Sequence, residues 1–368
     1  MSGVKVKRTR RIAINTGGGD APGLNAVIRA ATLSALQMGW EVIGIRRGYT
    51  GLLEGEVDGE PGVFPLTANS VRGITHLGGT ILGTTTRGNP FGLDVRRPDG
   101  TWGVADRSTE IVRRFEEMEI DALIAIGGDG SLNIANALQA KGLPVIGVPK
   151  TIDNDLAATD MTFGFQTAVE VATDAIGRLH STAEAHQRTM IVQVMGRHTG
   201  WIALESGLAG GSDVILIPEI PYQTSSIVAK IRERDEERRR FSIIVIAEGA
   251  VPAGGEPSYV DQTGRYGGIA DRLAVELETL TGKETRSMVL GHIQRGGTPI
   301  AYDRNLALRF GAAAVRCINE GRLGTMVALQ GNEIVPVPLL DAVKELKRVP
   351  VDCDMVCTAR QLGVCLGD

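Results

Sequence analysis

Residues 121–131 read Asp-Ala-Leu-Ile-Ala-Ile-Gly-Gly-Asp-Gly-Ser, an apolar run that passes directly into a glycine-rich turn. A short apolar run bounded by glycine is typical of a fully buried strand. A helical pattern follows as far as Lys141, and another apolar strand follows at residues 144–148. Strand, turn, helix and strand in this order predict a parallel sheet that helices cover on both faces.

The same order of elements recurs along the chain. Residues 11–15 are apolar, residues 16–23 are rich in glycine, and residues 24–38 have the periodicity of a helix. We expect two α/β domains, because 368 residues are too many for one typical core. Further strands are predicted at residues 40–45, 189–194, 214–217 and 241–247, and further helices at residues 166–185, 224–239 and 268–280.

The composition excludes several classes of protein. The chain has 39 basic and 43 acidic residues, a net charge of −4 that gives no overall attraction to nucleic acid or to an anionic membrane. The basic N-terminus leads into a short strand, so we expect neither a secretory signal nor a membrane span. The charged run at residues 232–240 is typical of a solvated helix face. The four cysteines lack the paired spacing of a zinc site, which predicts the reduced thiols of a cytoplasmic protein: Cys317, Cys353, Cys357 and Cys365.

Glycine clusters directly follow the predicted strands. In parallel sheets, ligands bind beyond the carboxyl ends of the strands, where glycine lets backbone amides approach a phosphate group. Residues 16–23 therefore indicate a phosphate-binding turn, although they match neither the Rossmann fingerprint nor the Walker loop. A merely tight turn is the alternative.

Two loops carry carboxylates at such strand ends. Asp129 is the predicted Mg²⁺ ligand, because Mg²⁺ prefers one or two carboxylates together with phosphate oxygens; the alternative is that Asp129 or Ser131 only caps a helix. Residues 149–155 read Pro-Lys-Thr-Ile-Asp-Asn-Asp. We assign Asp153 as the general base and Asp155 as a metal ligand through water, although Asp-Asn-Asp is also a common turn composition. We expect these three acids to meet around one cation.

A sugar phosphate as acceptor requires cations, and arginine suits bidentate phosphate binding. The candidates are Arg188, Arg197, Arg286 and Arg295. His292 precedes Arg295 by three residues and could address the same phosphate. Glu248 follows a predicted strand, where it could accept hydrogen bonds from sugar hydroxyls or could be an ordinary surface carboxylate.

Taken together, these segments resemble the phosphofructokinase family over most of the chain. The matching segments follow the family's order: residues 18–25, 78–83, 127–131, 149–155, 195–197 and 290–297. NAD kinases and lipid kinases have a turn similar to Gly-Gly-Asp-Gly, but they lack the Asp-Asn-Asp and His-Ile-Gln-Arg-Gly-Gly segments. The resemblance implies two Rossmann-like three-layer α/β/α domains with mainly parallel sheets. The donor-binding domain would comprise residues 1–164 and about 294–344, and the sugar-phosphate-binding domain about 165–293 and 345–368.

The resemblance also implies roles for individual residues. The phosphoryl donor would be surrounded by Gly19, Tyr49, Arg87, Gly128, Asp129, Gly130 and Ser131. The sugar phosphate would be surrounded by Thr151, Asp153, Arg188, Met195, Gly196, Arg197, Glu248, Arg286, His292 and Arg295. The catalytic group would be Asp153, Thr151, Arg197 and Lys150. Because the positions of Arg188 and Arg286 reach a neighbouring subunit's site in the family, a homotetramer or homodimer is implied.

Two positions bear on the donor. Gly130 resembles the family members that use ATP, whereas Lys150 resembles those that use pyrophosphate and marks the family's mixed-substrate subgroup. Glycine at position 130 leaves room for a nucleotide, which an aspartate would crowd and repel. We therefore predict an ATP- and Mg²⁺-dependent 6-phosphofructokinase of glycolysis that phosphorylates the 1-hydroxyl of fructose 6-phosphate. The alternatives are a pyrophosphate-dependent enzyme, a kinase for another sugar phosphate such as sedoheptulose 7-phosphate, and a silent sugar-phosphate sensor.

Overall fold

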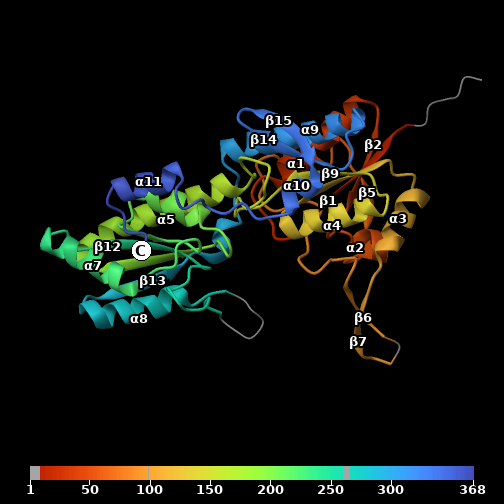
Figure 1. Ribbon diagram of the computed structural model, residues 1–368. Coiled ribbons are helices and arrows are strands. Elements are labelled where there is room, and N and C mark those ends of the chain that lie inside the picture. The colour runs from red at the N-terminus through yellow and green to blue at the C-terminus, as the bar shows by residue number, and fades with distance from the viewer. Residues whose placement is uncertain (1–8, 98, 260–265) are drawn as a thin grey trace, which may run out of the picture. The chain divides into compact units, whose positions relative to one another are not determined.

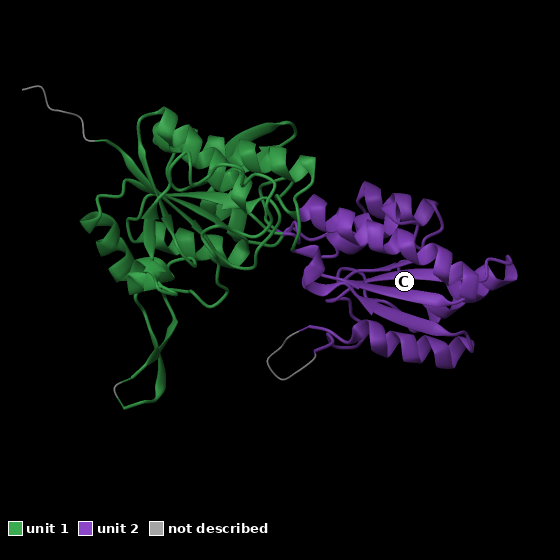
Figure 2. Ribbon diagram, turned by 180° about the vertical axis from the view of Figure 1, so that it is seen from behind, with its two compact units in different colours: residues 1–151, 156–164, 296–346 green, residues 152–155, 165–295, 347–368 purple. Residues whose placement is uncertain are grey.

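The chain forms two compact units, each built from separate stretches of sequence (Figure 2). The computed structural model describes residues 9–97, 99–259 and 266–368 (Figure 1), so the basic residues 1–8 lie outside the described part. Unit 1 comprises residues 1–151, 156–164 and 296–346, and unit 2 comprises residues 152–155, 165–295 and 347–368.

The predicted donor domain included residues 152–155, but these four residues belong to unit 2. The physical reason is their hydrogen bonding. Thr199 Oγ1 donates to the carbonyl oxygen of Asp153, and Lys347 Nζ donates to Asn154 Oδ1. Both partners are residues of unit 2.

Unit 1 contains a seven-stranded sheet with the order β15-β14-β9-β8-β1-β2-β5. The five inner strands are parallel to one another, and β5 and β15 are antiparallel edge strands. Antiparallel edges of this kind are common on otherwise parallel sheets. The strands are β1 (Arg11–Thr16), β2 (Glu41–Ile45), β5 (Val63–Pro65), β8 (Ala122–Gly127), β9 (Val145–Pro149), β14 (Thr325–Gln330) and β15 (Glu333–Pro338).

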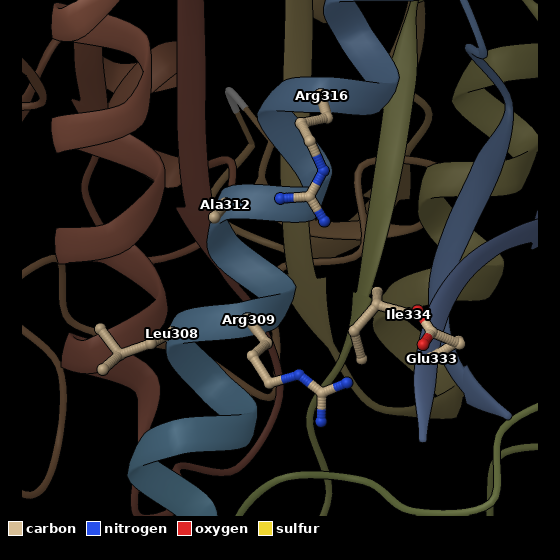
Figure 3. Close-up of a pocket in the computed structure, with 6 residues that line it drawn as sticks. All are labelled: Leu308, Arg309, Ala312, Arg316, Glu333 and Ile334. Atoms are coloured by element: carbon tan, nitrogen blue, oxygen red, sulfur yellow. The ribbon is translucent and has the colours of Figure 1, made fainter. Parts of the chain in front are cut away.

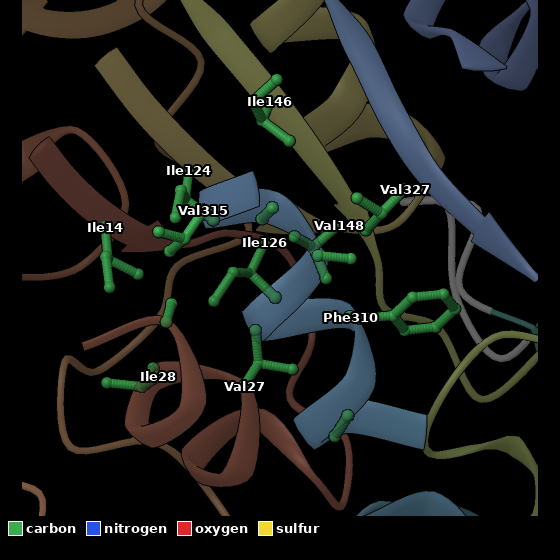
Figure 4. Close-up of a cluster of buried hydrophobic side chains, with 14 of the residues drawn as sticks. Ile14, Val27, Ile28, Ile124, Ile126, Ile146, Val148, Phe310, Val315 and Val327 are labelled. Carbon is green, nitrogen blue, oxygen red and sulfur yellow. The ribbon is translucent and has the colours of Figure 1, made fainter. Parts of the chain in front are cut away.

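Helices cover both faces of this sheet. In β1, Ile12 and Ile14 belong to one buried cluster and Ala13 belongs to the other, because successive side chains point to opposite faces. Figure 4 shows part of the first cluster, in which Val27 and Phe310 lie against the strands. The first face carries α1 (Leu24–Gln37) and α9 (Ala301–Asn319), and the second carries α2 (Thr50–Glu54), α3 (Ser108–Glu117), α4 (Asp129–Ala140) and α10 (Leu339–Val343).

Two short hairpins complete unit 1. They are β3 (Glu56–Val57) with β4 (Glu60–Pro61), and β6 (Leu93–Arg96) with β7 (Trp102–Ala105). The second hairpin projects from the body of unit 1 in Figure 1, and its Trp102 side chain is exposed. Neither hairpin was predicted, because strands of two to four residues give too little apolar alternation to be recognised.

Unit 2 contains a four-stranded, entirely parallel sheet with the order β11-β12-β10-β13. Its strands are β10 (Thr189–Val194), β11 (Val214–Leu216), β12 (Ser242–Ala247) and β13 (Thr285–Val289). One face packs against α7 (Thr224–Glu236) and α8 (Ile269–Thr281), and the other packs against α5 (Phe165–His186) and α6 (Trp201–Ala209). Helix α11 (Asp354–Gln361) contacts α6, and the short 3₁₀ helix η1 (Gly291–Gln294) follows β13.

The predicted fold class, α/β with mainly parallel sheets, is confirmed, and every strand and helix predicted from the sequence is present within a few residues of its predicted bounds. The charged run at residues 232–240 departs from the predicted solvated face. Arg234 is buried and forms an ion pair of 2.6 Å with Asp213. None of the described helices is long and apolar enough to cross a membrane.

Helices α1 and α9 approach each other closely at Gly311. A Cβ atom added there would lie 2.6 Å from the carbonyl oxygen of Val27 and 2.8 Å from the Cβ of Ala30. We expect Gly311→Ala to lower the free energy of unfolding by about 1–3 kcal/mol, because the helices would have to move apart. Urea unfolding would measure the change.

A matched control is Gly177→Ala in α5, where an added Cβ would meet no atom within 4 Å. Alanine should stabilise this exposed helical position by about 0.5–1 kcal/mol. Equal effects of the two substitutions would contradict the close packing of α1 and α9.

Candidate functional site

The first turn of unit 1 follows β1 and is tied to two other segments. The amide of Gly17 donates to the carbonyl oxygen of Ile126 at 2.9 Å, and the amide of Gly18 donates to that of Thr85 at 3.0 Å. Thr84 Oγ1 donates to the carbonyl oxygen of Gly18 at 2.6 Å. Gly18 has a φ of 79°, a conformation that favours glycine. The turn is therefore held in one conformation, next to residues 84–87.

Ser131 occupies space that two glycines leave open. A Cβ atom added to Gly17 would lie 2.7 Å from Ser131 Oγ, and one added to Gly127 would lie 2.3 Å from Ser131 Cβ. Gly17 directly follows β1 and Gly127 ends β8, and these two strands are parallel neighbours. The absence of side chains at both positions lets the two turns close around the Ser131 hydroxyl.

Lys150 joins the end of β9 to both turns. Its side chain is almost fully buried, its Nζ donates to the carbonyl oxygen of Gly19, and its amide donates to the carbonyl oxygen of Gly127 at 2.9 Å. The structure thus brings Gly19, Ser131 and Lys150 together at the carboxyl end of the sheet. A lysine ammonium beside backbone amides of glycine turns is suited to binding phosphate.

Helix α4 begins at Asp129, and its N-cap residue is Gly128, without a side-chain cap. The alternative that Asp129 or Ser131 merely caps the helix is therefore wrong. The Asp129 carboxylate accepts a hydrogen bond of 3.0 Å from Asn133 Nδ2. A Cβ atom added at Gly130 would meet no atom within 4 Å, so this position borders open space.

Two other predicted donor-binding residues, Tyr49 and Arg87, differ in their exposure to solvent. Tyr49 is buried in the core with Leu52 and Leu123, and this burial raises the pKa of its hydroxyl. Arg87 is exposed, and its amide donates to Thr85 Oγ1 at 3.1 Å. A contact of either residue with a donor stays a prediction.

In unit 2, the ends of β10 and β12 bring two predicted residues side by side. The amide of Glu248 donates to the carbonyl oxygen of Val194 at 2.9 Å, and the amide of Gly249 donates to that of Gly196 at 3.0 Å. A Cβ atom at Gly249 would lie 1.9 Å from the carbonyl oxygen of Arg197, so only glycine allows this approach. Arg197 Nε then lies 3.7 Å from Glu248 Oε1.

The pKa of the Glu248 carboxyl depends on its burial and on three charged neighbours. Burial raises the pKa of its carboxyl to about 7; the positive charges of Arg197 and Arg295 lower this pKa, and the negative charge of Asp153 raises it. These four side chains thus interact within unit 2, and they combine two acids with two guanidinium groups. Such a set can bind an anionic, hydroxylated acceptor.

The loop with His292 and Arg295 is fixed by a residue that we did not predict. Gln294 is fully buried, its Oε1 accepts a hydrogen bond from the Met195 amide at 3.4 Å, and its Nε2 donates to the carbonyl oxygen of Gly291 at 2.9 Å. Gln294 therefore joins the His292–Arg295 loop to the end of β10. The only sequence signal for it is an amide side chain inside a motif rich in glycine.

Arg188 and Arg286 lie at the opposite, amino-terminal end of this sheet, at the beginning of β10 and β13. Both pair with Glu284, at 2.6 Å from Arg188 Nε and 2.5 Å from Arg286 Nη2. A strand of six residues is about 20 Å long. The structure therefore does not bring these two arginines to Arg197 within one chain, and their contribution to a neighbouring subunit's site stays a prediction.

The three predicted acids are divided between the units: Asp129 is in unit 1, and Asp153 and Asp155 are in unit 2. Their meeting around one cation stays a prediction. Among the described residues, no group of three or more His, Cys, Asp or Glu side chains is arranged to hold a metal. Asp129 by itself is a sufficient protein ligand for Mg²⁺, because Mg²⁺ binds one or two carboxylates and completes its coordination shell with water and phosphate oxygens.

A groove of about 410 Å³ lies elsewhere on unit 1, between α9 and β15 (Figure 3). Its lining residues include Arg309 and Arg316 of α9, and the guanidinium group of Arg309 extends toward β15 in Figure 3. Arg309 also donates to the carbonyl oxygen of Asn332. None of the residues that line this groove is a predicted site residue.

Comparison with known proteins gives consistent matches. A family model described as phosphofructokinase matches residues 11–318. An ATP-dependent 6-phosphofructokinase of Chloroflexus aurantiacus is 54% identical, over 98% of this chain and 99% of the relative. A pyrophosphate–fructose 6-phosphate 1-phosphotransferase of Amycolatopsis mediterranei is 50% identical, over 93% of this chain and 97% of the relative.

Among solved structures, phosphofructokinase from Pichia pastoris in the T-state matches with a TM-score of 0.79 and 32% identity over 93% of this chain. This chain spans only 36% of the length of that larger chain. A pyrophosphate-dependent phosphofructokinase from Marinobacter aquaeolei shares the fold, with a TM-score of 0.78 and 21% identity over 98% of this chain and 92% of the other.

The raised pKa of Glu248 predicts a pH-dependent stability. Because this carboxyl has a pKa of about 7 in the folded chain and an ordinary value of 4.5, its protonation stabilises the fold below pH 4.5, and this contribution is lost as the pH rises through 7. Glutamine does not titrate. We expect Glu248→Gln to gain on the order of 2 kcal/mol of stability relative to the unmodified chain between pH 4.5 and 8, as measured by urea unfolding. A difference that does not vary with pH would contradict the assignment.

Proposed function

Because the chain belongs to the phosphofructokinase family, we propose that it is an ATP-dependent 6-phosphofructokinase of glycolysis. The reaction transfers the γ-phosphoryl group of ATP to the 1-hydroxyl of fructose 6-phosphate and yields fructose 1,6-bisphosphate and ADP. The observation that carries the proposal is the cluster of Asp153, Arg197, Glu248 and Arg295 in unit 2. It combines a general base with cations for a phosphate and an acceptor for sugar hydroxyls.

Unit 1 would bind the donor. The backbone amides of Gly19 and residues 128–131, the Ser131 hydroxyl and the Lys150 ammonium lie in the turns at the carboxyl end of its sheet. These groups suit the phosphates of ATP. Asp129 would hold Mg²⁺, with Asp155 assisting through a water molecule, and the bound ion would offset negative charge on the phosphates.

Unit 2 would bind and activate the acceptor. Arg197, Arg295 and His292 would hold the 6-phosphate, and Glu248 would accept a hydrogen bond from a sugar hydroxyl. Asp153 would accept the proton of the 1-hydroxyl as its oxygen bonds to the γ-phosphorus. The bond from this phosphorus to the bridging oxygen of ADP breaks in the same transfer.

The choice of ATP is supported by position 130. The open space beside Gly130 leaves room for the rest of a nucleotide. Pyrophosphate is the second candidate donor, because Lys150 lies in the turn at Gly19 and the Amycolatopsis mediterranei relative is named for pyrophosphate.

The proposal extends to assembly and location. Arg188 and Arg286 lie away from the acceptor cluster of their own chain and pair with Glu284. A cytoplasmic homotetramer or homodimer, in which these arginines complete a neighbour's sugar-phosphate site, would give both a function.

A matrix of donors and acceptors tests this function. We expect the purified chain with Mg²⁺ to phosphorylate fructose 6-phosphate from ATP in preference to pyrophosphate, and to prefer it over sedoheptulose 7-phosphate. Gly130→Asp should lower kcat/KM for ATP at least about tenfold by placing a negative charge next to the nucleotide phosphates. Gly130→Ala is the control and should retain ATP use, because its Cβ meets no atom. Activity with pyrophosphate alone would overturn the choice of donor.

Asp153→Asn tests the general base. Asparagine keeps the size of the side chain but cannot accept the hydroxyl proton, so kcat should fall by roughly 10²- to 10⁴-fold while fructose 6-phosphate still binds. Isothermal titration calorimetry and steady-state assays would separate the two effects. Asp160→Asn, an exposed position in unit 1, is the control. Near-normal turnover of Asp153→Asn would remove Asp153 from this role.

A further inference from the structure

We propose that Lys347 is a positioning residue that fixes the loop containing Asp153 and Asp155 for catalysis. The proposal rests on the proposed function, because it concerns the loop that would supply the general base. Lys347 begins the last stretch of unit 2 and lies 193 residues after Asn154 in the chain.

The loop has an unfavourable backbone at its centre. Asn154, between the two aspartates, has a φ of 50°, in the left-handed region that asparagine adopts more often than most residues but less readily than glycine. Asn154 is also buried, with 3% of its surface exposed. Such a conformation persists only when the surrounding structure enforces it. The contacts that enforce it therefore determine how the flanking aspartates are held.

Lys347 supplies two of these contacts. Its Nζ donates to Asn154 Oδ1 at 2.9 Å, and its backbone amide donates to the carbonyl oxygen of Asp155 at 2.9 Å. The first bond is charge-assisted, because the donor is an ammonium group. One residue thus holds both the strained asparagine and the aspartate that follows it.

Lys347 is itself held in place by the beginning of α6. Trp201 Nε1 donates to the carbonyl oxygen of Lys347 at 2.9 Å, and the Lys347 ammonium lies 5.7 Å from the centroid of the Trp201 ring. Two residues before Trp201, Thr199 Oγ1 donates to the carbonyl oxygen of Asp153 at 3.1 Å. The loop is therefore anchored at Asp153 by Thr199 and at Asn154 and Asp155 by Lys347.

The positive charge of Lys347 has a second neighbour. Burial raises the pKa of Glu205, and Lys347 is the cation that lowers it. Glu205 also accepts a hydrogen bond of 2.9 Å from Gln166. The ammonium therefore donates to an amide oxygen and also acts electrostatically on a half-buried carboxylate, so methionine at this position would remove both interactions.

The expected consequence is a loss of alignment. Without the ammonium, Asn154 can relax out of the left-handed region and carry the Asp153 carboxylate with it. Misplacement of a catalytic group by about 1 Å can cost roughly 10²-fold in rate. The effect should fall on kcat, because the general base would be displaced, whereas Arg197, Arg295 and His292, which would hold the sugar phosphate, lie on other segments of unit 2.

The test compares Lys347→Met with Lys347→Arg in the full-length chain. Lys347→Met should lower kcat by about 10- to 100-fold and leave KM for ATP and fructose 6-phosphate within about threefold. Lys347→Arg should recover most of kcat, because it restores a cationic donor to Asn154. The control is Lys344→Met at an exposed lysine three residues earlier, and it should change neither constant.

A double-substitution cycle distinguishes positioning from a general structural role. Glycine adopts a left-handed backbone freely, so in the Asn154→Gly background Lys347→Met should cost less than about threefold in kcat. Equal costs of Lys347→Met in both backgrounds, or unchanged kcat in Lys347→Met alone, would overturn the proposal.

Hydrogen exchange gives a readout that needs no activity. The amides of residues 152–156 should exchange at least about tenfold faster in Lys347→Met than in Lys344→Met. If the unmodified chain lacks phosphofructokinase activity, the proposed function fails, whereas unchanged exchange in Lys347→Met overturns the role of Lys347 in holding the loop.

Discussion

The donor side of the site depends on a close approach of backbone that only glycine allows. Gly17 and Gly127 lie at the carboxyl ends of neighbouring strands, and Cβ atoms at these positions would clash with the Ser131 side chain. Lys150 joins the third strand to the same place through Gly19 and Gly127. The parallel sheet aligns the carboxyl ends of these strands. Because the glycines have no side chains, the hydrogen-bond donors that can bind phosphate lie close together there.

Unit 2 also contains a close backbone approach that requires glycine. Gly249 lets the backbone after β12 contact the carbonyl oxygen of Arg197. This contact places Glu248 beside Arg197 in surroundings dry enough to raise the pKa of its carboxyl to about 7. The two units thus use glycine to assemble chemically distinct halves, one rich in backbone amides and one rich in opposed side-chain charges.

The sequence predicted what depends on local pattern. Apolar strands followed by glycine turns located the parallel sheets and most of the residues at their carboxyl ends. Contacts between distant segments were missed, because no local pattern encodes them. Gln294 supports the end of β10 from the 3₁₀ helix η1, and Lys347 lies 193 residues from the asparagine it holds. The buried ion pair of Arg234 with Asp213 was missed for the same reason, because Arg234 belongs to a run of charges typical of a surface.

The interleaving of the two units along the chain has a consequence for synthesis on the ribosome. Helix α9 and strands β14 and β15 belong to unit 1 but follow the long middle stretch of unit 2, residues 165–295. At typical translation speeds, roughly ten seconds or more separate the emergence of β9 from that of α9. During this interval the apolar face of α1 that later packs against α9 is uncovered in the nascent polypeptide, and a face of this kind is the surface that chaperones shield.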